Sequence, residues 1–457
     1  MPIGGAAAVA AAVLVATNSR YDYHRDELYF RMLRPAWGYV DQPPLTPLLA
    51  RASAAVFGDT VWAMRLPATV CVVVAIVLTA LITRELGGGR RAQTLCAWGY
   101  AFAAMPLLFG HVMLTATVDL PVWAAVILFA LRALLRGEPR WWLAAGAVTG
   151  MALYNKHLIV LLLVSLAFGL LWLGPRSALR SRWLWAGVGL AALIGSPNLI
   201  YQVTHGFPQL DMAAALSENK GATRVQLLPF QPLLLGPPVT AIWVAGLVAL
   251  FRRPAWRPAR ALAGAYPVLL VIVLISGGQI YYPVGLVGFL FAAGCVPTVD
   301  WVARRPGPRR ALVVAGLALN TAVTLVLALP LLPVDVLGDT PVPAINQATR
   351  DQIGWPAYTR EVAAVYAALP QADRAKAVVV TGNYGEAGAL DRYGPDRRLP
   401  LPIYSGQNEL YRYGPPPEAA TVAVVVGLPL PYLQARFGNC TVAGVLDNGV
   451  GVDNEEQ

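Results

Sequence analysis

Long apolar runs recur along this chain, and they constrain its fold more than any other feature. A helix needs about 20 apolar residues to cross about 30 Å of hydrocarbon. The runs lack the alternation of a membrane β-strand, and only 13% of the residues are charged, against about 25% in soluble domains. The sequence therefore predicts an all-α polytopic membrane protein. Eleven helices are expected near residues 2–17, 61–83, 92–110, 117–135, 141–155, 157–173, 184–201, 230–251, 260–276, 280–297 and 311–332.

The distribution of arginine predicts the orientation of these helices. Five short loops each carry three or more Arg, at residues 84–91, 132–140, 176–182, 252–260 and 304–310. Loops on the opposite side, at 111–116, 154–157 and 276–280, carry one basic residue in total, Lys156. By the positive-inside rule the Arg-rich loops are cytoplasmic. The formal net charge of +10 is then explained by orientation, and no nucleic-acid partner is expected.

The composition changes after residue 333. Residues 378–382 and 421–426 have the pattern of strands, and residues 360–369 have that of a helix. We therefore predict two domains: a membrane domain over 1–333 with an extracytoplasmic loop at 18–60, and a small extracytoplasmic α/β domain over 334–457. The four cysteines show no disulfide or metal-site spacing.

The loop at 18–60 concentrates acids and aromatic residues between two apolar runs. It contains Asp26, Glu27 and Asp41, together with His24 and Gln42. Acids beside an apolar surface are desolvated, which raises the pKa of a carboxyl group and makes it a better base. The alternatives are a solvated acid pair, an interfacial belt of Tyr and Trp, and a helix cap at Asp41.

Two further ionisable positions interrupt apolar runs. Asp119 lies about one turn into a run, where an acid is costly and by default a functional candidate; the alternative is a helix cap. Lys156, followed by His157, carries a point charge suited to a phosphate at the membrane surface. Its alternative is a side chain that extends to the interface.

Several motifs resemble bacterial glycosyltransferase family 39, which includes relatives of the dolichyl-phosphate-mannose–protein mannosyltransferases and the lipid A aminoarabinose transferases. The resemblance is carried by residues 23–29, 37–46, 57–58, 65–66, 119, 155–157, 202–208 and 281–283, and in the tail by 382–387 and 404–408. It implies a GT-C fold in the bacterial plasma membrane, with the active site on the extracytoplasmic side.

The resemblance also implies roles for individual residues. Asp26 matches the acid of the first loop that acts on the acceptor, and Asp119 matches a second acid at a helix start. Lys156 matches a family lysine, whereas His157 replaces the usual Gly. The pair Asp41-Gln42 stands where the aminoarabinose transferases have Glu-Lys, so this chain lacks a cation there.

The expected function is transfer of a sugar, with inversion, from a polyprenyl-phosphate donor to an extracytoplasmic hydroxyl on a lipid, glycan or protein. We predict Asp26 as base, with Glu27 and Asp119 as orienting groups. Lys156 is the principal phosphate cation, with Arg65 and Arg224 as helpers. Other substrate contacts are expected from His24, Asp41, Gln42, His157, Gln279, Tyr281 and Tyr282.

The partners implied are the donor, membrane lipids and the acceptor. No cofactor is required, and a divalent cation stays an open alternative. The competing function is a transporter or flippase of a lipid-linked sugar or small solute. Transporters place ionisable residues near the bilayer midplane and often contain internal repeats. Here the ionisable residues gather at one end of the predicted helices.

Overall fold

The structure, a computed structural model, describes residues 2–217, 221–452 and 454. The chain divides into two compact units. The first, called the membrane unit below, comprises Met1–Ala16, Gln42–Thr46 and Leu66–Leu329. The second, called the tail unit, comprises Thr17–Asp41, Pro47–Arg65 and Pro330–Gln457.

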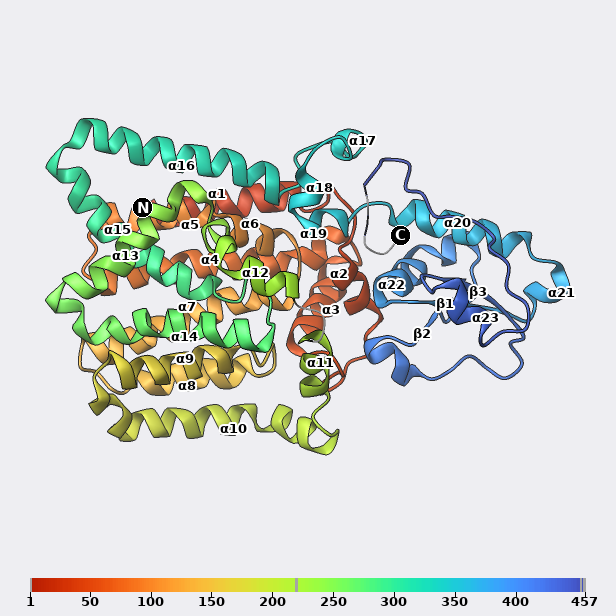
Figure 1. The fold of residues 1–457 in the computed structure, drawn as a ribbon, viewed down its shortest axis with the longest axis horizontal. Coiled ribbons are helices and arrows are strands. Elements are labelled where there is room, and N and C mark those ends of the chain that lie inside the picture. Colours follow the sequence, from red (N-terminus) through yellow and green to blue (C-terminus); the bar gives the residue numbers. More distant parts are fainter. Residues whose placement is uncertain (1, 218–220, 453, 455–457) are drawn as a thin grey trace. The chain divides into compact units, whose positions relative to one another are not determined.

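Each of the eleven predicted apolar ranges is helical in the structure (Figure 1). Two of them are broken, the range at 92–110 into α5 and α6 and the range at 230–251 into short 3-10 turns and α13. The helices are α1 (Pro2–Thr17), α4 (Val61–Glu85), α5 (Arg90–Ala101), α6 (Ala104–His111), α7 (Thr115–Leu135), α8 (Trp141–Ala152), α9 (Ile159–Trp172), α10 (Arg182–Thr204), α11 (Pro208–Ser217), α12 (Gly221–Phe230), α13 (Thr240–Arg252), α14 (Arg260–Ser276), α15 (Val284–Arg304) and α16 (Pro306–Ala328).

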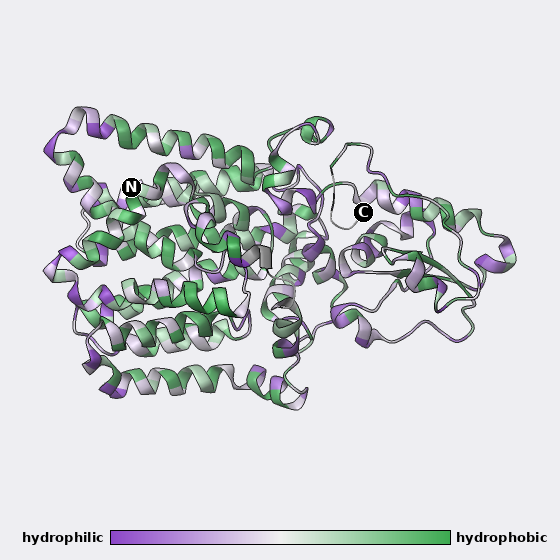
Figure 2. Cartoon of the chain, in the orientation of Figure 1, coloured by the Kyte–Doolittle hydropathy of each residue, from purple (hydrophilic) through white to green (hydrophobic). Residues whose placement is uncertain are grey.

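The helices confirm a multi-pass membrane protein. Within the described residues, 6 helices are long and apolar enough to cross a membrane, and up to 8 if each bent pair counts as one span. The bends are 54° between α5 and α6 and 73° before α13. Hydrophobic residues run along these helices, and hydrophilic residues gather in the turns that join them (Figure 2). The figure of eleven spans stays a prediction.

Small residues set the close helix contacts of the membrane unit. A β-carbon on Gly294 of α15 would lie 1.8 Å from the Ile242 carbonyl oxygen of α13. A β-carbon on Gly146 of α8 would lie 2.1 Å from the Gly187 carbonyl oxygen of α10. Apolar side chains gain little by leaving lipid for a helix interface, so packing of close backbones is a main attraction between membrane helices. Glycine permits that approach here.

The tail unit contains the predicted small α/β fold. Its parallel sheet has the order β2-β1-β3, with Val380 opposite Tyr404 and Ala377 opposite Val422. Helices α20 and α22 pack against each other and against the sheet. Its elements are α2 (Arg25–Met32), most of α3 (Leu45–Phe57), α17 (Val334–Leu337), α18 (Val342–Ile345), α19 (Gln347–Arg350), α20 (Trp355–Ala368), α21 (Gln371–Arg374), β1 (Ala377–Thr381), α22 (Tyr384–Tyr393), β2 (Tyr404–Ser405), β3 (Val422–Val426) and α23 (Leu430–Gln434).

The two compact units of the structure do not coincide with the two domains predicted on either side of residue 333. The tail unit begins its last segment at Pro330, and it also takes most of the loop at 18–60. This loop had been assigned to the membrane domain on sequence order alone. Its acids pack with residues more than 300 positions away, as the hydrogen bond between Asp26 and Tyr384 illustrates.

Candidate active site

Two acids of the tail unit, Asp26 and Glu27, lie in the first turn of α2, whose N-terminus is capped. At the N-terminus of α2 the His24 Nδ1 atom accepts a hydrogen bond from the Asp26 backbone N–H at 3.1 Å. The Glu27 carboxylate accepts the His24 N–H at 2.8 Å, which completes a capping box. Burial lowers the pKa of His24 to about 4, so the ring is neutral near pH 7 and accepts a hydrogen bond. The structure thus gives His24 a capping role.

Glu27 forms a fully buried ion pair with Arg65. The Arg65 Nε and one terminal nitrogen donate to the carboxylate at 2.9 and 2.8 Å, and neither side chain is exposed. The same terminal nitrogen also donates to the backbone oxygen of Asp22 at 2.7 Å, and the other terminal nitrogen donates to that of Asn18 at 2.6 Å. Because these contacts join Arg65 to the loop, we infer that Arg65 maintains the conformation of the loop. Its predicted contact with a phosphate stays a prediction.

Asp26 and Asp41 each accept a hydrogen bond from a tyrosine. Asp26 is half-buried, and its Oδ1 accepts from the Tyr384 hydroxyl at 2.9 Å. Asp41 Oδ1 accepts from the Tyr29 hydroxyl at 2.8 Å. Burial raises the pKa of Asp41 to about 7, although the Tyr29 hydrogen bond opposes this shift. Asp41 therefore lies near its titration point at neutral pH, whichever role it has.

In the membrane unit, Asp119 lies one turn into α7. Thr117 stabilises the start of the helix. Its hydroxyl accepts a hydrogen bond from the Leu114 N–H at 3.1 Å and donates one to the Phe109 carbonyl at 2.9 Å. Thr117 therefore takes the capping role that was the alternative for Asp119. Asp119 Oδ1 instead accepts from the Asn155 side-chain amide at 3.0 Å.

Asn155 is itself held from both sides. Its Nδ2 also donates to the Thr115 carbonyl at 2.9 Å, and its Oδ1 accepts from the Thr46 hydroxyl at 2.5 Å. All of these side chains except Thr115 are buried. The second oxygen of Asp119, Oδ2, is buried and has no hydrogen-bond partner among the described residues. Buried polar atoms without partners are rare in proteins and call for an explanation.

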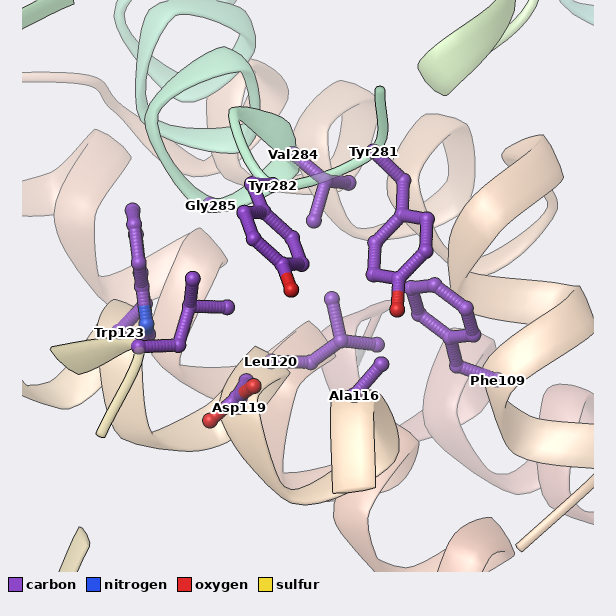
Figure 3. A pocket seen from close by; sticks show the side chains of 10 residues that line it. Phe109, Ala116, Asp119, Leu120, Trp123, Tyr281, Tyr282, Val284 and Gly285 are labelled. Carbon is purple, nitrogen blue, oxygen red and sulfur yellow. The ribbon is translucent and has the colours of Figure 1, made fainter. Parts of the chain in front are cut away.

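A pocket lies beside Asp119. Tyr281 and Tyr282 reach from the segment before α15 toward α7, which carries Asp119 (Figure 3). The pocket is lined by Phe109, Ala116, Asp119, Leu120, Trp123, Leu158, Tyr281, Tyr282, Val284 and Gly285. The indole N–H of Trp123 also lacks a partner among the described residues. An unpaired acceptor and an unpaired donor thus belong to side chains that line the same pocket.

Lys156 lies next to this group. Its ammonium nitrogen is 5.1 Å from the centre of the Tyr282 ring. No ion pair within 4.0 Å joins it to a carboxylate among the described residues. Asp119 is an acid close enough for its charge to act on Lys156. Lys156 thus differs from Arg65 in having no carboxylate within ion-pair distance among the described residues.

The other predicted substrate contacts lie in separate places within the membrane unit. His157 Nε2 is 2.8 Å from the Asn198 Oδ1 atom of α10. The exposed Arg224 of α12 donates to the carbonyl of Leu274 at 3.1 Å. Gln279 is half-buried in the turn before α15, and Gln42 is buried. No contact of the described residues tests a substrate role for these four.

The sequence predictions thus fall into two groups, one in each unit. His24, Asp26, Glu27, Asp41 and Arg65 lie in the tail unit, whereas Asp119, Lys156, Tyr281 and Tyr282 gather in the membrane unit. Three residues of these groups carry no role predicted from the sequence: Asn155, Trp123 and Tyr384. Asn155 and Tyr384 stand inside motifs that carried the resemblance, which was the available signal; nothing in the sequence marked Trp123.

The described residues offer no ready metal centre. No group of three or more His, Cys, Asp or Glu side chains among them is arranged to hold a metal ion. The question of a divalent cation stays open, since a substrate phosphate can supply metal ligands of its own.

Comparison with known proteins finds a family model that matches part of the chain and solved structures that share its fold. Residues 41–201 match the family described as dolichyl-phosphate-mannose-protein mannosyltransferase. No curated protein sequence matches the chain significantly.

Three solved structures are similar in fold. ArnT from Cupriavidus metallidurans in the apo state has a TM-score of 0.60 at 18% identity, over 89% of this chain and 86% of that one. ArnT bound to undecaprenyl phosphate gives a TM-score of 0.58 at the same identity and coverage. The archaeal oligosaccharyltransferase AglB from Archaeoglobus fulgidus, in complex with an inhibitory peptide and a dolichol-phosphate, gives 0.52 at 12% identity, over 87% of this chain and 64% of that one. The predicted GT-C fold is confirmed.

Proposed function

We propose that this chain, a membrane protein of GT-C fold, is a glycosyltransferase that uses a polyprenyl-phosphate-linked sugar as its donor. Two comparisons support the proposal. The description of the family matched by residues 41–201 names dolichyl-phosphate-mannose. A solved structure of the same fold contains undecaprenyl phosphate. The acceptor is a hydroxyl group on a lipid, glycan or protein at the extracytoplasmic face.

One observation carries the proposal: Asp119 and Tyr282 line a pocket of the membrane unit, and Lys156 lies beside the Tyr282 ring. A cation without a close carboxylate attracts an anion, and a phosphodiester at a membrane surface is such an anion. The pocket has a volume of about 10 Å³, so its side chains must move before a sugar enters. Its aromatic lining is of the kind that packs against the apolar faces of sugars and prenyl chains. The unpaired Asp119 Oδ2 atom is an acceptor for a sugar hydroxyl.

The chemistry is then a single displacement. The acceptor oxygen attacks C1 of the sugar, the bond from C1 to the phosphate oxygen breaks, and polyprenyl phosphate leaves with the electron pair. The reaction inverts the configuration at C1. Asp26 accepts the proton of the acceptor hydroxyl, and Lys156 stabilises the negative charge that develops on the phosphate. Glu27 fixes the loop that carries Asp26, through its ion pair with Arg65.

The competing proposal is a transporter or flippase of a lipid-linked sugar. A partly unpaired acid inside a membrane helix also fits a transport pathway. The two differ in products, because a transporter moves the donor intact whereas a transferase releases polyprenyl phosphate.

The decisive experiment incubates the purified protein with a panel of radiolabelled polyprenyl-phosphate hexoses and pentoses, and measures the release of polyprenyl phosphate. We expect release with at least one donor, and a 10²–10⁴-fold lower rate for Asp26→Asn. Asp373→Asn, which changes an exposed acid of the tail unit, is the matched control and keeps the wild-type rate. Transfer of intact donor across vesicles without release supports the transporter.

The orientation is tested by labelling single cysteines introduced at exposed positions of a cysteine-free variant. Trp37 is 68% exposed in the loop after α2, and Arg90 is exposed in an Arg-rich loop. An impermeant thiol reagent added to intact cells should label Trp37→Cys and leave Arg90→Cys unlabelled. Labelling of Arg90→Cys alone would reverse the assignment of sides.

A further inference from the structure

The tail motif Asn383-Tyr384-Gly385-Glu386-Ala387-Gly388 builds the start of α22. The Asn383 side chain accepts the Glu386 N–H at 2.9 Å, and the Glu386 carboxylate accepts the Asn383 N–H at 3.1 Å. Glu386 also accepts the Gly382 N–H at 2.9 Å. This capping box fixes where the helix begins and therefore where the Tyr384 side chain projects.

The same helix packs closely on α2, the helix that carries Asp26. A β-carbon on Gly388 would lie 2.7 to 2.9 Å from the side chain and backbone of Leu28. Ala387 and Ala389 on either side are fully buried. Small residues thus bring the backbone of α22 against the backbone of α2, and larger ones would push the two helices apart.

Tyr384 is held on several sides. Its backbone N–H donates to the Gln407 Oε1 atom at 2.8 Å. Its ring centre lies 4.8 Å from that of Tyr29. Its hydroxyl donates to Asp26 Oδ1 at 2.9 Å. The phenol therefore reaches the carboxylate from a fixed support.

We propose that Tyr384 is a positioning residue for Asp26, and that the α22 segment therefore takes part in sugar transfer. The hydroxyl holds Oδ1, which fixes the rotation of the carboxylate and directs Oδ2 toward the acceptor hydroxyl. A base must lie within hydrogen-bond reach of the proton that it removes, and a small loss of alignment is costly in rate. The inference rests on the proposed role of Asp26 as the base.

A second tyrosine on the same helix provides a matched control. The Tyr393 hydroxyl donates to the Asp22 carboxylate, which belongs to the same loop as Asp26. Both tyrosines thus link α22 to a loop acid by the same kind of hydrogen bond. Of the two tyrosines, Tyr384 is the one whose hydroxyl donates to the proposed base. Removing the Tyr384 hydroxyl should therefore lower kcat, whereas removing that of Tyr393 should affect stability alone.

The experiment compares Tyr384→Phe, Tyr393→Phe, Asp26→Asn and the double variant Asp26→Asn/Tyr384→Phe in the full-length protein. The Phe variants keep the rings and remove one hydroxyl each. For Tyr384→Phe we expect kcat to fall about tenfold or more, as the loss of a charge-assisted hydrogen bond predicts, with the donor KM unchanged. For Tyr393→Phe we expect an unchanged kcat, whatever its effect on the midpoint of thermal unfolding.

The double variant separates positioning from structural support. If Tyr384 acts through Asp26, its substitution adds no further loss once Asp26 is Asn. Losses that multiply, or equal kcat for the two Phe variants, overturn the inference while leaving Asp26 as the base. An Asp26→Asn variant that keeps more than a tenth of the wild-type kcat removes the base assignment itself, and the inference with it.

Discussion

Two groups of charged side chains, one in each unit, differ in how far hydrogen bonds and opposite charges satisfy them. In the tail unit, the Arg65 guanidinium donates to Glu27 and to two backbone oxygens, and neither charged group is exposed. In the membrane unit, Asp119 has one hydrogen-bonded oxygen and one buried oxygen without a described partner. Lys156 faces the ring of Tyr282 without a close carboxylate among the described residues.

We infer from this difference that the tail-unit group serves the fold and that the membrane-unit group is the better candidate for binding a ligand. Burying a charge is costly unless hydrogen bonds and an opposite charge compensate for it. The Glu27–Arg65 pair receives this compensation within the protein, so its task is to hold the loop. Asp119 keeps one oxygen without a partner among the described residues, and Lys156 has no carboxylate within 4.0 Å there, so we propose that a sugar hydroxyl and a phosphate bind to them.

The largest expected effect is on stability, from breaking the satisfied pair. Glu27→Gln leaves the buried Arg65 charge without its partner, which we expect to lower the free energy of unfolding by about 3–5 kcal/mol. Thermal unfolding of the purified variant in detergent measures this. As a control, Asp300→Asn removes the partner of Arg253 in a largely exposed pair and should cost less than about 1 kcal/mol.

A double variant tests whether the loss comes from the unpaired charge. Glu27→Met/Arg65→Met replaces both charges by apolar groups, which is often neutral for a buried pair. We expect it to be clearly more stable than Glu27→Gln. Equal instability of the two variants would mean that the loop depends on the hydrogen bonds of Arg65 to the backbone.

Asp119→Asn should have the opposite balance of effects. It removes a charge that the protein leaves partly uncompensated, so the midpoint of thermal unfolding stays level or rises. The value of kcat/KM should fall about 10- to 100-fold, because a hydrogen-bond acceptor for the substrate is lost. A fall in stability as large as that of Glu27→Gln would contradict the contrast between the two groups.

Lys156→Met should weaken binding of the donor without unfolding the protein. A charge-assisted contact with phosphate is worth about 1.5–3 kcal/mol, so affinity for polyprenyl phosphate should fall about 10- to 100-fold. Binding titration with the lipid phosphate measures the change. Unchanged affinity would leave Lys156 with the alternative role of a side chain that extends to the interface.

Asp41 offers a smaller effect that depends on pH. Its pKa in the folded protein is raised to about 7 by burial, with the Asp26 and Glu409 charges adding to the shift. An acid with a raised folded-state pKa favours the folded state at low pH, and this stability is lost as the pH rises through 7. Between pH 5 and pH 6 the loss approaches about 1.4 kcal/mol per pH unit.

Asp41→Asn tests that dependence, because Asn keeps an oxygen that can accept from the Tyr29 hydroxyl. We expect the variant to match the wild type in thermal unfolding near pH 4 and to exceed it progressively as the pH rises to 7. Curves that stay parallel over this range would show that the pKa of Asp41 is the same in the folded and the unfolded chain.

Much of the fold was predictable because a bilayer imposes simple patterns. Apolar length and short Arg-rich loops predicted helices such as α4 and α7 to within a few residues. The breaks within the ranges at 92–110 and 230–251 were not predicted. The hydrophobicity of a run of apolar residues does not distinguish a straight helix from a bent one, because both are compatible with a lipid environment.

The candidate site was predictable in its residue types and less so in its partners. Asp119, Lys156 and Tyr282 stood out as polar groups in apolar surroundings, and the structure brings them together. The pairing of Glu27 with Arg65 joins residues 38 positions apart, and no spacing rule predicts it. Sequence analysis therefore identified the charges without showing which of them the protein itself neutralises.

Arg224 provides the smallest expected effect and tests the comparison at its margin. The sequence grouped it with Lys156 as a phosphate cation, yet its guanidinium is exposed and donates to the carbonyl of Leu274 near the C-terminal end of α14. A cation at that end of a helix offsets the dipole and contributes about 0.3–1 kcal/mol. Arg224→Met should therefore change the free energy of unfolding by less than about 1 kcal/mol. Donor affinity should change less than about threefold, which corresponds to less than about 0.7 kcal/mol. A tenfold loss of affinity for polyprenyl phosphate, measured beside Lys156→Met, would instead make Arg224 a second phosphate cation. Exposed charged side chains would then also have to be considered as ligand-binding groups.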